Sequence, residues 1–66
     1  MVPMSTFTIP SEGTEVHILD QWGNITATVI AEGPVVDPHD PTPRIIGWHD
    51  VSGNQYWFGF DIWETV

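Results

Sequence analysis

Apolar residues alternate with a period of two in every ordered-looking run of this 66-residue chain, and none shows the spacing of a helix. The runs are "VHIL", "ITATV", "RIIGW" and "QYWF", and they are rich in β-branched and aromatic residues. Such runs are typical of strands that bury one face, and glycine or proline separates them. The pattern therefore predicts a small all-β domain of five short strands.

The expected strands begin after a turn at Gly13 and continue through 25–32 and a hairpin over 44–58 to a short closing strand near the C-terminus. Four of the six prolines lie between Gly33 and Pro43, which predicts an extended proline-rich loop without ladder hydrogen bonds. Residues 1–12 are expected to be a loosely ordered segment or an edge strand near 6–9, and residues 13–66 the domain itself.

Alternation also predicts which side chains pack together. In the hairpin, Trp48 is expected opposite Tyr56, which places Gly47 opposite Trp57 on the outer face. The inward positions of all strands give the predicted core: Val16, Ile18, Ala27, Val29, Ile46, Trp48, Tyr56, Phe58 and Ile62.

Three segments, "GTEVHILDQWGNITATVI", "IIGWHDVSGNQYWF" and "DIWETV", resemble the SH3-like barrel superfamily in strand order and hydrophobic spacing. Photosystem I reaction-centre subunit IV and Tudor-like domains are similar in layout. The resemblance implies a five-stranded, closed or nearly closed barrel that binds proteins, peptides or nucleic acids. The chain departs from the nucleic-acid-binding relatives because it lacks their basic residues.

The net charge of the chain limits the classes of partner that it is expected to bind. The chain has nine acidic residues and Arg44 as its only Lys or Arg, so its net charge is -8. Phosphate binding depends on Lys and Arg, so direct nucleic-acid binding and binding to anionic membranes are not expected. There is no cysteine for a disulfide or thiolate zinc site, and no apolar run approaches the ~20 residues that span a bilayer. These features favour a cytoplasmic protein.

Few residues of the chain are candidates for catalysis or metal binding. The two His-Asp pairs, at 39–40 and 49–50, are neighbours that point apart on a strand, and Asp50 is expected to cap its own turn. Ser5, Ser11 and Ser52 lie outside any nucleophile elbow. We therefore expect no catalytic residue, cofactor or metal site, and no enzyme activity.

Aromatic residues carry the remaining signal, because exposed Trp is uncommon and Trp dominates interface hot spots. Trp57 is expected to face outward beside Ile45 and His49. Trp22 lies in a predicted turn and Trp63 near the closing strand. The predicted partner-binding residues are Trp57, Trp22, Trp63, Ile45, His49 and Asp50. The alternative is that these Trp side chains pack beneath the N-terminal segment or the proline-rich loop.

Two functions remain open at this point. The first is an interaction module that binds a protein partner, or a second copy of the chain, through an outer aromatic surface; an aromatic cage for a methylated cation is a narrower version. The second is an acidic decoy or inhibitor, of the kind that phages encode, which mimics nucleic acid and blocks a basic DNA- or RNA-binding protein.

Overall fold

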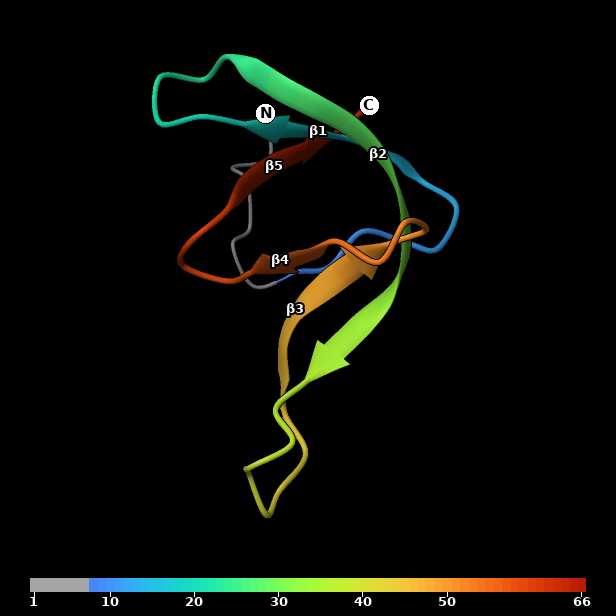
Figure 1. Cartoon of the computed structure of the whole chain (residues 1–66), viewed down its shortest axis with the longest axis vertical. Coiled ribbons are helices and arrows are strands. Elements are labelled where there is room, and N and C mark those ends of the chain that lie inside the picture. The colour runs from blue at the N-terminus through green and yellow to red at the C-terminus, as the bar shows by residue number, and fades with distance from the viewer. Residues whose placement is uncertain (1–7) are drawn as a thin grey trace.

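The computed structural model describes residues 8–66 and shows one antiparallel sheet of five strands (Figure 1). Their order in the sheet is β4-β3-β2-β1-β5, and the described residues contain no helix. The all-β prediction is therefore confirmed. The strands are β1 (Glu15–Leu19), β2 (Ile25–Val36), β3 (Ile45–Asp50), β4 (Gln55–Trp57) and β5 (Ile62–Thr65).

The long strand β2 belongs to both halves of the sheet. Residues 25–30 pair with β1, and residues 31–36 pair with β3. Figure 1 shows the strand bending between these halves, so that the sheet wraps around its inner face. Strands β4 and β5 form the two ends of the sheet order and do not pair with each other. The sheet is thus open, whereas a closed or nearly closed barrel was predicted.

The predicted boundaries of the proline-rich loop are wrong. Gly33, Pro34 and Val35 lie in β2 and pair with β3, with Pro34 opposite Trp48. Proline has no N–H to give to a ladder, and it is tolerated here beside a register shift between Ala31 and Gly33. The connecting loop is therefore confined to residues 37–44, and it projects away from the sheet (Figure 1).

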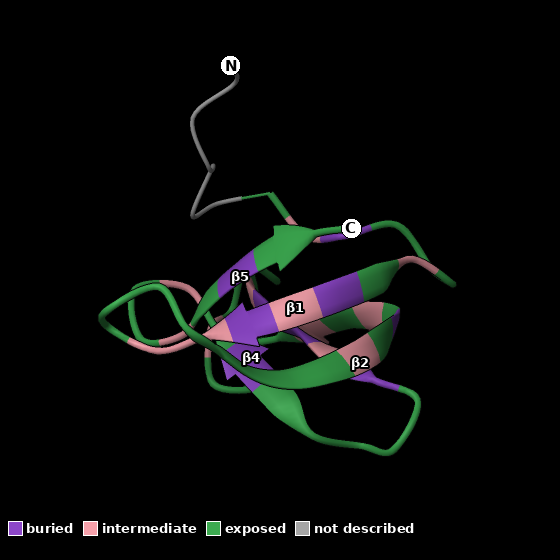
Figure 2. Ribbon diagram, turned by 90° about the horizontal axis from the view of Figure 1, so that it is seen from above, coloured by how far each residue is buried: buried purple, intermediate pink, exposed green. Residues whose placement is uncertain are grey.

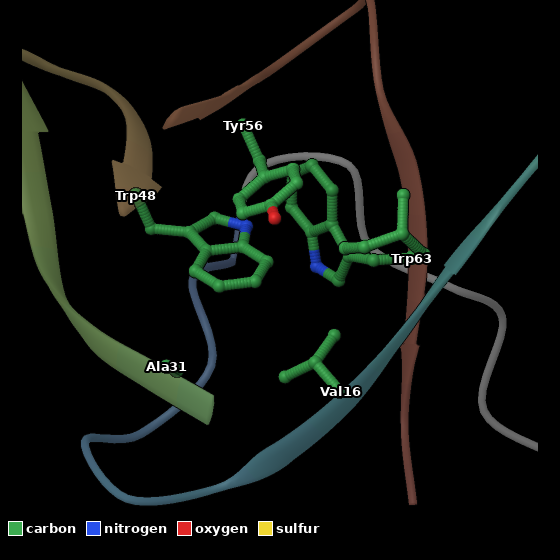
Figure 3. Close-up of a cluster of buried hydrophobic side chains, with 6 residues drawn as sticks. Val16, Ala31, Trp48, Tyr56 and Trp63 are labelled. Atoms are coloured by element: carbon green, nitrogen blue, oxygen red, sulfur yellow. The ribbon is translucent and has the colours of Figure 1, made fainter. Parts of the chain in front are cut away.

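The core is small and aromatic. Trp48 stacks on Tyr56 with ring centroids 4.5 Å apart, and Trp63 meets Trp48 edge to face at 5.6 Å. Figure 3 shows these three rings converging over Val16. Large rings provide burial that a short chain cannot obtain from many aliphatic side chains. The buried hydrophobic residues are Val16, Ile18, Ala31, Trp48, Tyr56 and Trp63.

Four predicted core residues are buried as expected: Val16, Ile18, Trp48 and Tyr56. The prediction was wrong for Ile62, which is exposed, because Trp63 pairs with the buried Ile18 and takes the inward position in β5. It was also wrong for Ala27, which is exposed because the core gathers four residues further along β2, at Ala31. The remaining three predicted core residues are only half-buried: Val29, Ile46 and Phe58.

The segment before β1 packs against the sheet without forming a strand. Ile9 contacts the core, and Pro10 is buried. The N–H of Gly13 donates to the carbonyl of Ala31 at 2.8 Å, and the N–H of Ala31 donates to the carbonyl of Thr14 at 2.9 Å. The possible edge strand at 6–9 falls partly outside the described residues, and positions 8 and 9 are not in a strand. Figure 2 shows buried residues alternating with half-buried ones along β1, after an exposed first residue.

Candidate interaction surface

The outer face of β2, β3 and β4 carries exposed apolar side chains in neighbouring positions. Gly47 pairs with Trp57 on one side and with Val35 on the other, and Ile45 pairs with Val36. Paired residues share a face, so these side chains form one surface. The exposed fractions are 39% for Trp57, 45% for Ile45 and 43% for Val36. We call these three residues, with the half-buried Val35 and the buried Gly47 that pair between them, the outer-face strip: Val35, Val36, Ile45, Gly47 and Trp57.

Gly47 has a structural reason to be glycine. A Cβ at this position would collide with the carbonyl oxygen of Tyr56 and would lie 3.0 Å from the Cα of Trp57. Gly47 is buried, so its backbone is not exposed on the outer face. The glycine instead lets β3 and β4 approach closely, which fixes the backbone that carries Trp57.

The segment from Gly33 to Pro43 does not lie across Trp57 as a covering loop. Its first four residues continue β2 beside β3, and Val35 and Val36 extend the strip. The backbone N–H of Trp57 donates to Oδ2 of Asp61 at 2.8 Å, which ties the turn after β4 to this strand. The strip is therefore an open face of three strands.

His49 lies beside the strip but is half-buried. It pairs with Gln55 in β4 and Gly33 in β2, and its Nδ1 lies 3.3 Å from the carbonyl oxygen of Asp50. A Cβ on Gly33 would lie 3.5 Å from Nε2 of His49, so the ring covers that glycine. His49 thus borders the strip rather than projecting from it.

Two of the predicted partner-binding residues are inside the domain. Trp63 is 8% exposed and packs against Trp48 and Phe58. Asp50 is 1% exposed. Neither side chain is available at the surface of this fold: Trp63 packs in the core, and Asp50 accepts hydrogen bonds within the domain.

Asp50 organises the turn between β3 and β4, as predicted. Its Oδ1 accepts the backbone N–H groups of Ser52 and Asn54, and its Oδ2 accepts the Tyr56 hydroxyl at 2.7 Å and the Asn54 side-chain amide at 3.2 Å. Burial alone would raise the pKa of Asp50, but these hydrogen bonds outweigh it and lower the pKa below 3.8. The carboxylate is therefore buried as an ion.

The turn over residues 20–24 has the same sequence pattern as the turn over residues 50–54, Asp-x-x-Gly-Asn. In both, the Asp Oδ1 accepts the N–H of the third residue at 2.9 Å and the N–H of the Asn, and Oδ2 accepts the Asn side chain. The glycines have φ of 85° and 89°. The third residue is Trp22 in one turn and Ser52 in the other, and Trp22 is 77% exposed.

Other exposed apolar residues lie at the same end of the molecule as Trp22, and none of them is among the predicted partner-binding residues. Phe60, in the turn between β4 and β5, is 87% exposed. Ile25 is 54% exposed and Ile62 is 38% exposed, and both pair with Leu19. Trp22 and Ile25 belong to the β1–β2 hairpin, whereas Phe60 and Ile62 belong to the β4–β5 connection. No local motif therefore predicts that they lie at the same end of the molecule.

The described residues contain no group of three or more His, Asp and Glu side chains that could hold a metal ion. Within the same part of the chain, no helix is long and apolar enough to cross a membrane. His17 and Glu64 form a cross-strand pair at 3.6 Å, and Arg44 lies 3.8 Å from Asp40 in the projecting loop.

No family model matches the chain, and no curated protein or solved structure matches it. Its function must be inferred from its own surfaces.

Proposed function

We propose that the chain is a protein-interaction module that binds a partner protein through the outer-face strip. One observation carries the proposal: Trp57, Ile45 and Val36 are exposed next to one another on three adjacent strands. Exposed apolar patches of this kind mark contact sites, and buried Trp anchors supply much of the energy in protein interfaces.

The backbone under the strip supports this role because it is held in place before binding. Close packing at Gly47 fixes β3 against β4, and the hydrogen bond from Trp57 to Asp61 fixes the end of β4. A surface that is already ordered loses less conformational entropy when a partner binds.

We also infer that the architecture is SH3-like. Successive strands β1 to β4 are antiparallel neighbours, and β5 returns to pair with β1. This connectivity supports the inference, and binding of peptides and proteins is common among domains of that class. The inference concerns the fold and leaves the partner's identity to experiment.

The test is affinity capture from host lysate with the wild-type chain, Trp57→Ala and Ile30→Ala, at low and high salt. Ile30 is a matched control because its exposed fraction, 38%, is almost that of Trp57, and it pairs with Glu15 in the other half of the sheet. We expect Trp57→Ala alone to weaken partner binding by about 2 kcal/mol or more, roughly 30-fold in Kd.

Two results would contradict the proposal. If Trp57→Ala strongly destabilises the monomer and leaves association intact, Trp57 belongs to the core. The second result has three parts: only basic nucleic-acid-binding proteins are captured, all of them are lost at high salt, and Trp57→Ala has no effect. The acidic decoy would then be the better explanation, because salt screens attraction between exposed charges that lie more than about 8 Å apart at physiological ionic strength, and over shorter distances at higher salt.

A further inference from the structure

A second apolar surface lies on the side of the molecule that holds two of the turns between strands. Residues 20–24 join β1 to β2 and residues 58–61 join β4 to β5, and both turns lie on the left of the molecule (Figure 1, Figure 2). Each turn presents an aromatic ring to solvent, 77% exposed for Trp22 and 87% for Phe60. We call this set the turn-end patch: the exposed residues Trp22, Ile25, Phe60 and Ile62, with the half-buried Leu19.

Strand pairing makes the patch continuous. Leu19 pairs with Ile25 in β2 and with Ile62 in β5, so the three side chains form a row across three strands on one face. Strands are spaced about 4.8 Å apart, so the row is about 10 Å long. Trp22 lies in the turn between Leu19 and Ile25, and Phe60 lies two residues before Ile62, so both aromatic residues are close to the row in sequence.

The turn over residues 20–24 does not need a Trp at position 22 in order to form. The turn over 50–54 forms the same hydrogen bonds with Ser52 at the corresponding position, so a small polar residue satisfies the turn. Phe60 closes its turn through backbone N–H donation to the carbonyl of Trp57 at 3.2 Å, which any residue except proline could provide. Two large rings exposed in rigid turns, without a structural need for either, indicate a surface that contacts something else.

The charges near the patch are negative. Asp20 and Asp61 belong to the two turns, and Glu64 follows Ile62 on the same face of β5. A hydrogen bond from the backbone N–H of Asn24 lowers the pKa of Asp20, so this carboxylate stays ionised in mildly acidic solution. Arg44 lies in the loop over 37–44, at the bottom of Figure 1, and is paired with Asp40.

These charges argue against two occupants. A second copy also carries a net charge of -8 and would bring like charges to the same patch. An anionic membrane would be repelled for the same reason. The acidic residues at its border favour a cationic partner, and the apolar row favours a partner that also carries an apolar stripe.

We propose that the turn-end patch is a second interaction surface, separate from the outer-face strip, which binds a Lys- and Arg-bearing amphipathic helix of another protein. The row of about 10 Å matches about two turns of a helix, the span of an i, i+4, i+7 apolar stripe. Its basic side chains would lie near Asp20 and Asp61. This inference does not depend on the role of the outer-face strip.

The probe is a synthetic amphipathic peptide of leucine and lysine, about four helical turns long, titrated into the ¹⁵N-labelled chain and followed by NMR. We expect shifts at the Trp22 indole N–H and at the backbone amides of Phe60 and Ile62. Trp22→Ser should weaken binding by at least about tenfold, the effect of losing an interface anchor. Trp57→Ala should leave peptide binding unchanged, which keeps this test independent of the first surface.

A transplanted side chain provides the matched control. Ser52→Trp, made in the Trp22→Ser background, places an exposed Trp in the equivalent turn, where the row of Leu19, Ile25 and Ile62 is absent. We expect no recovery of binding. Full recovery of peptide binding would mean that any exposed Trp is enough to bind the peptide, and the turn-end patch would not be a specific site.

Three other results would overturn the inference. Equal binding of a leucine and glutamate peptide would show that charge plays no part. Self-association in sedimentation experiments that Trp22→Ser abolishes would make a second copy the occupant. Binding to phosphatidylcholine vesicles through Trp22, without binding to the cationic peptide, would make the occupant a lipid surface.

Discussion

The hydroxyl of Tyr56 donates a 2.7 Å hydrogen bond to Oδ2 of Asp50, and both side chains are buried. This bond joins the β3–β4 turn to the aromatic core, because the Tyr56 ring stacks on Trp48. An ionised acceptor makes such a hydrogen bond stronger than one between neutral groups.

Tyr56→Phe should therefore lower the free energy of unfolding by about 1.5–3 kcal/mol, since it retains the stacked ring and removes one hydrogen bond to a buried charge. Urea denaturation measures the change. A double-mutant cycle with Asp50→Asn provides the control, because it isolates the energy shared by the pair. A coupling energy near zero would show that the bond contributes nothing to stability.

The same pair predicts loss of stability at alkaline pH. Burial, with the nearby Asp50 carboxylate, raises the pKa of Tyr56 from 10.0 to about 12. A raised folded-state pKa contributes stability that is complete below the unfolded value and is lost as pH rises from 10 to about 12. The loss should amount to about 3 kcal/mol.

The chain contains one tyrosine, so tyrosinate absorbance reports Tyr56 alone. We expect the native chain to titrate near 12 and the chain in denaturant near 10. Unfolding free energies measured across this range should fall for the wild type and should not show this fall for Tyr56→Phe. A native titration near 10 would contradict the burial of the hydroxyl.

Gly47→Ala should destabilise the domain by about 1–3 kcal/mol or more, because the added methyl group collides with the backbone of β4. Gly33→Ala is the control. A Cβ on Gly33 meets only Nε2 of His49 at 3.5 Å, an ordinary contact, so we expect a much smaller change. Thermal unfolding of both variants measures the difference. Equal midpoints would mean that β3 and β4 are too far apart for a methyl group at position 47 to collide with β4.

Trp63 and Trp22 should respond in opposite ways to truncation. Trp63 is 8% exposed and packs on Trp48, so Trp63→Ala should cost about 3–5 kcal/mol, comparable with the whole stability of so small a domain. Trp22→Ser should change stability by less than about 0.5 kcal/mol. Circular dichroism during heating distinguishes the two variants. A native-like melt for Trp63→Ala would contradict the placement of Trp63 in the core.

Local patterns predicted the parts of the fold that depend on neighbouring residues. The alternation around Trp48 and Tyr56 predicted their pairing, and with it the pairing of Gly47 and Trp57. The cap at Asp50 also followed from its position before a turn. Both features lie within one hairpin, where sequence distance and spatial distance agree.

Features that depend on distant pairing could not be predicted. The inward position of Trp63 depends on its register with Ile18, and a shift by one residue would have turned Ile62 inward instead. Pro34 indicates a loop by local rules, yet pairing with β3 keeps it in β2. The turn-end patch combines Trp22 from the β1–β2 turn with Phe60 from the β4–β5 turn, and only the fold brings them to one end.

Because β2 takes part in both halves of the sheet, neither half can unfold without affecting the other. Ala31 lies where the strand changes partners, and its N–H is bonded to Thr14 and its carbonyl to Gly13. Breaking either half would disturb these bonds, so partial unfolding should be rare. In hydrogen exchange, the Ala31 amide should exchange only through global unfolding, and its protection should equal the stability of the whole domain.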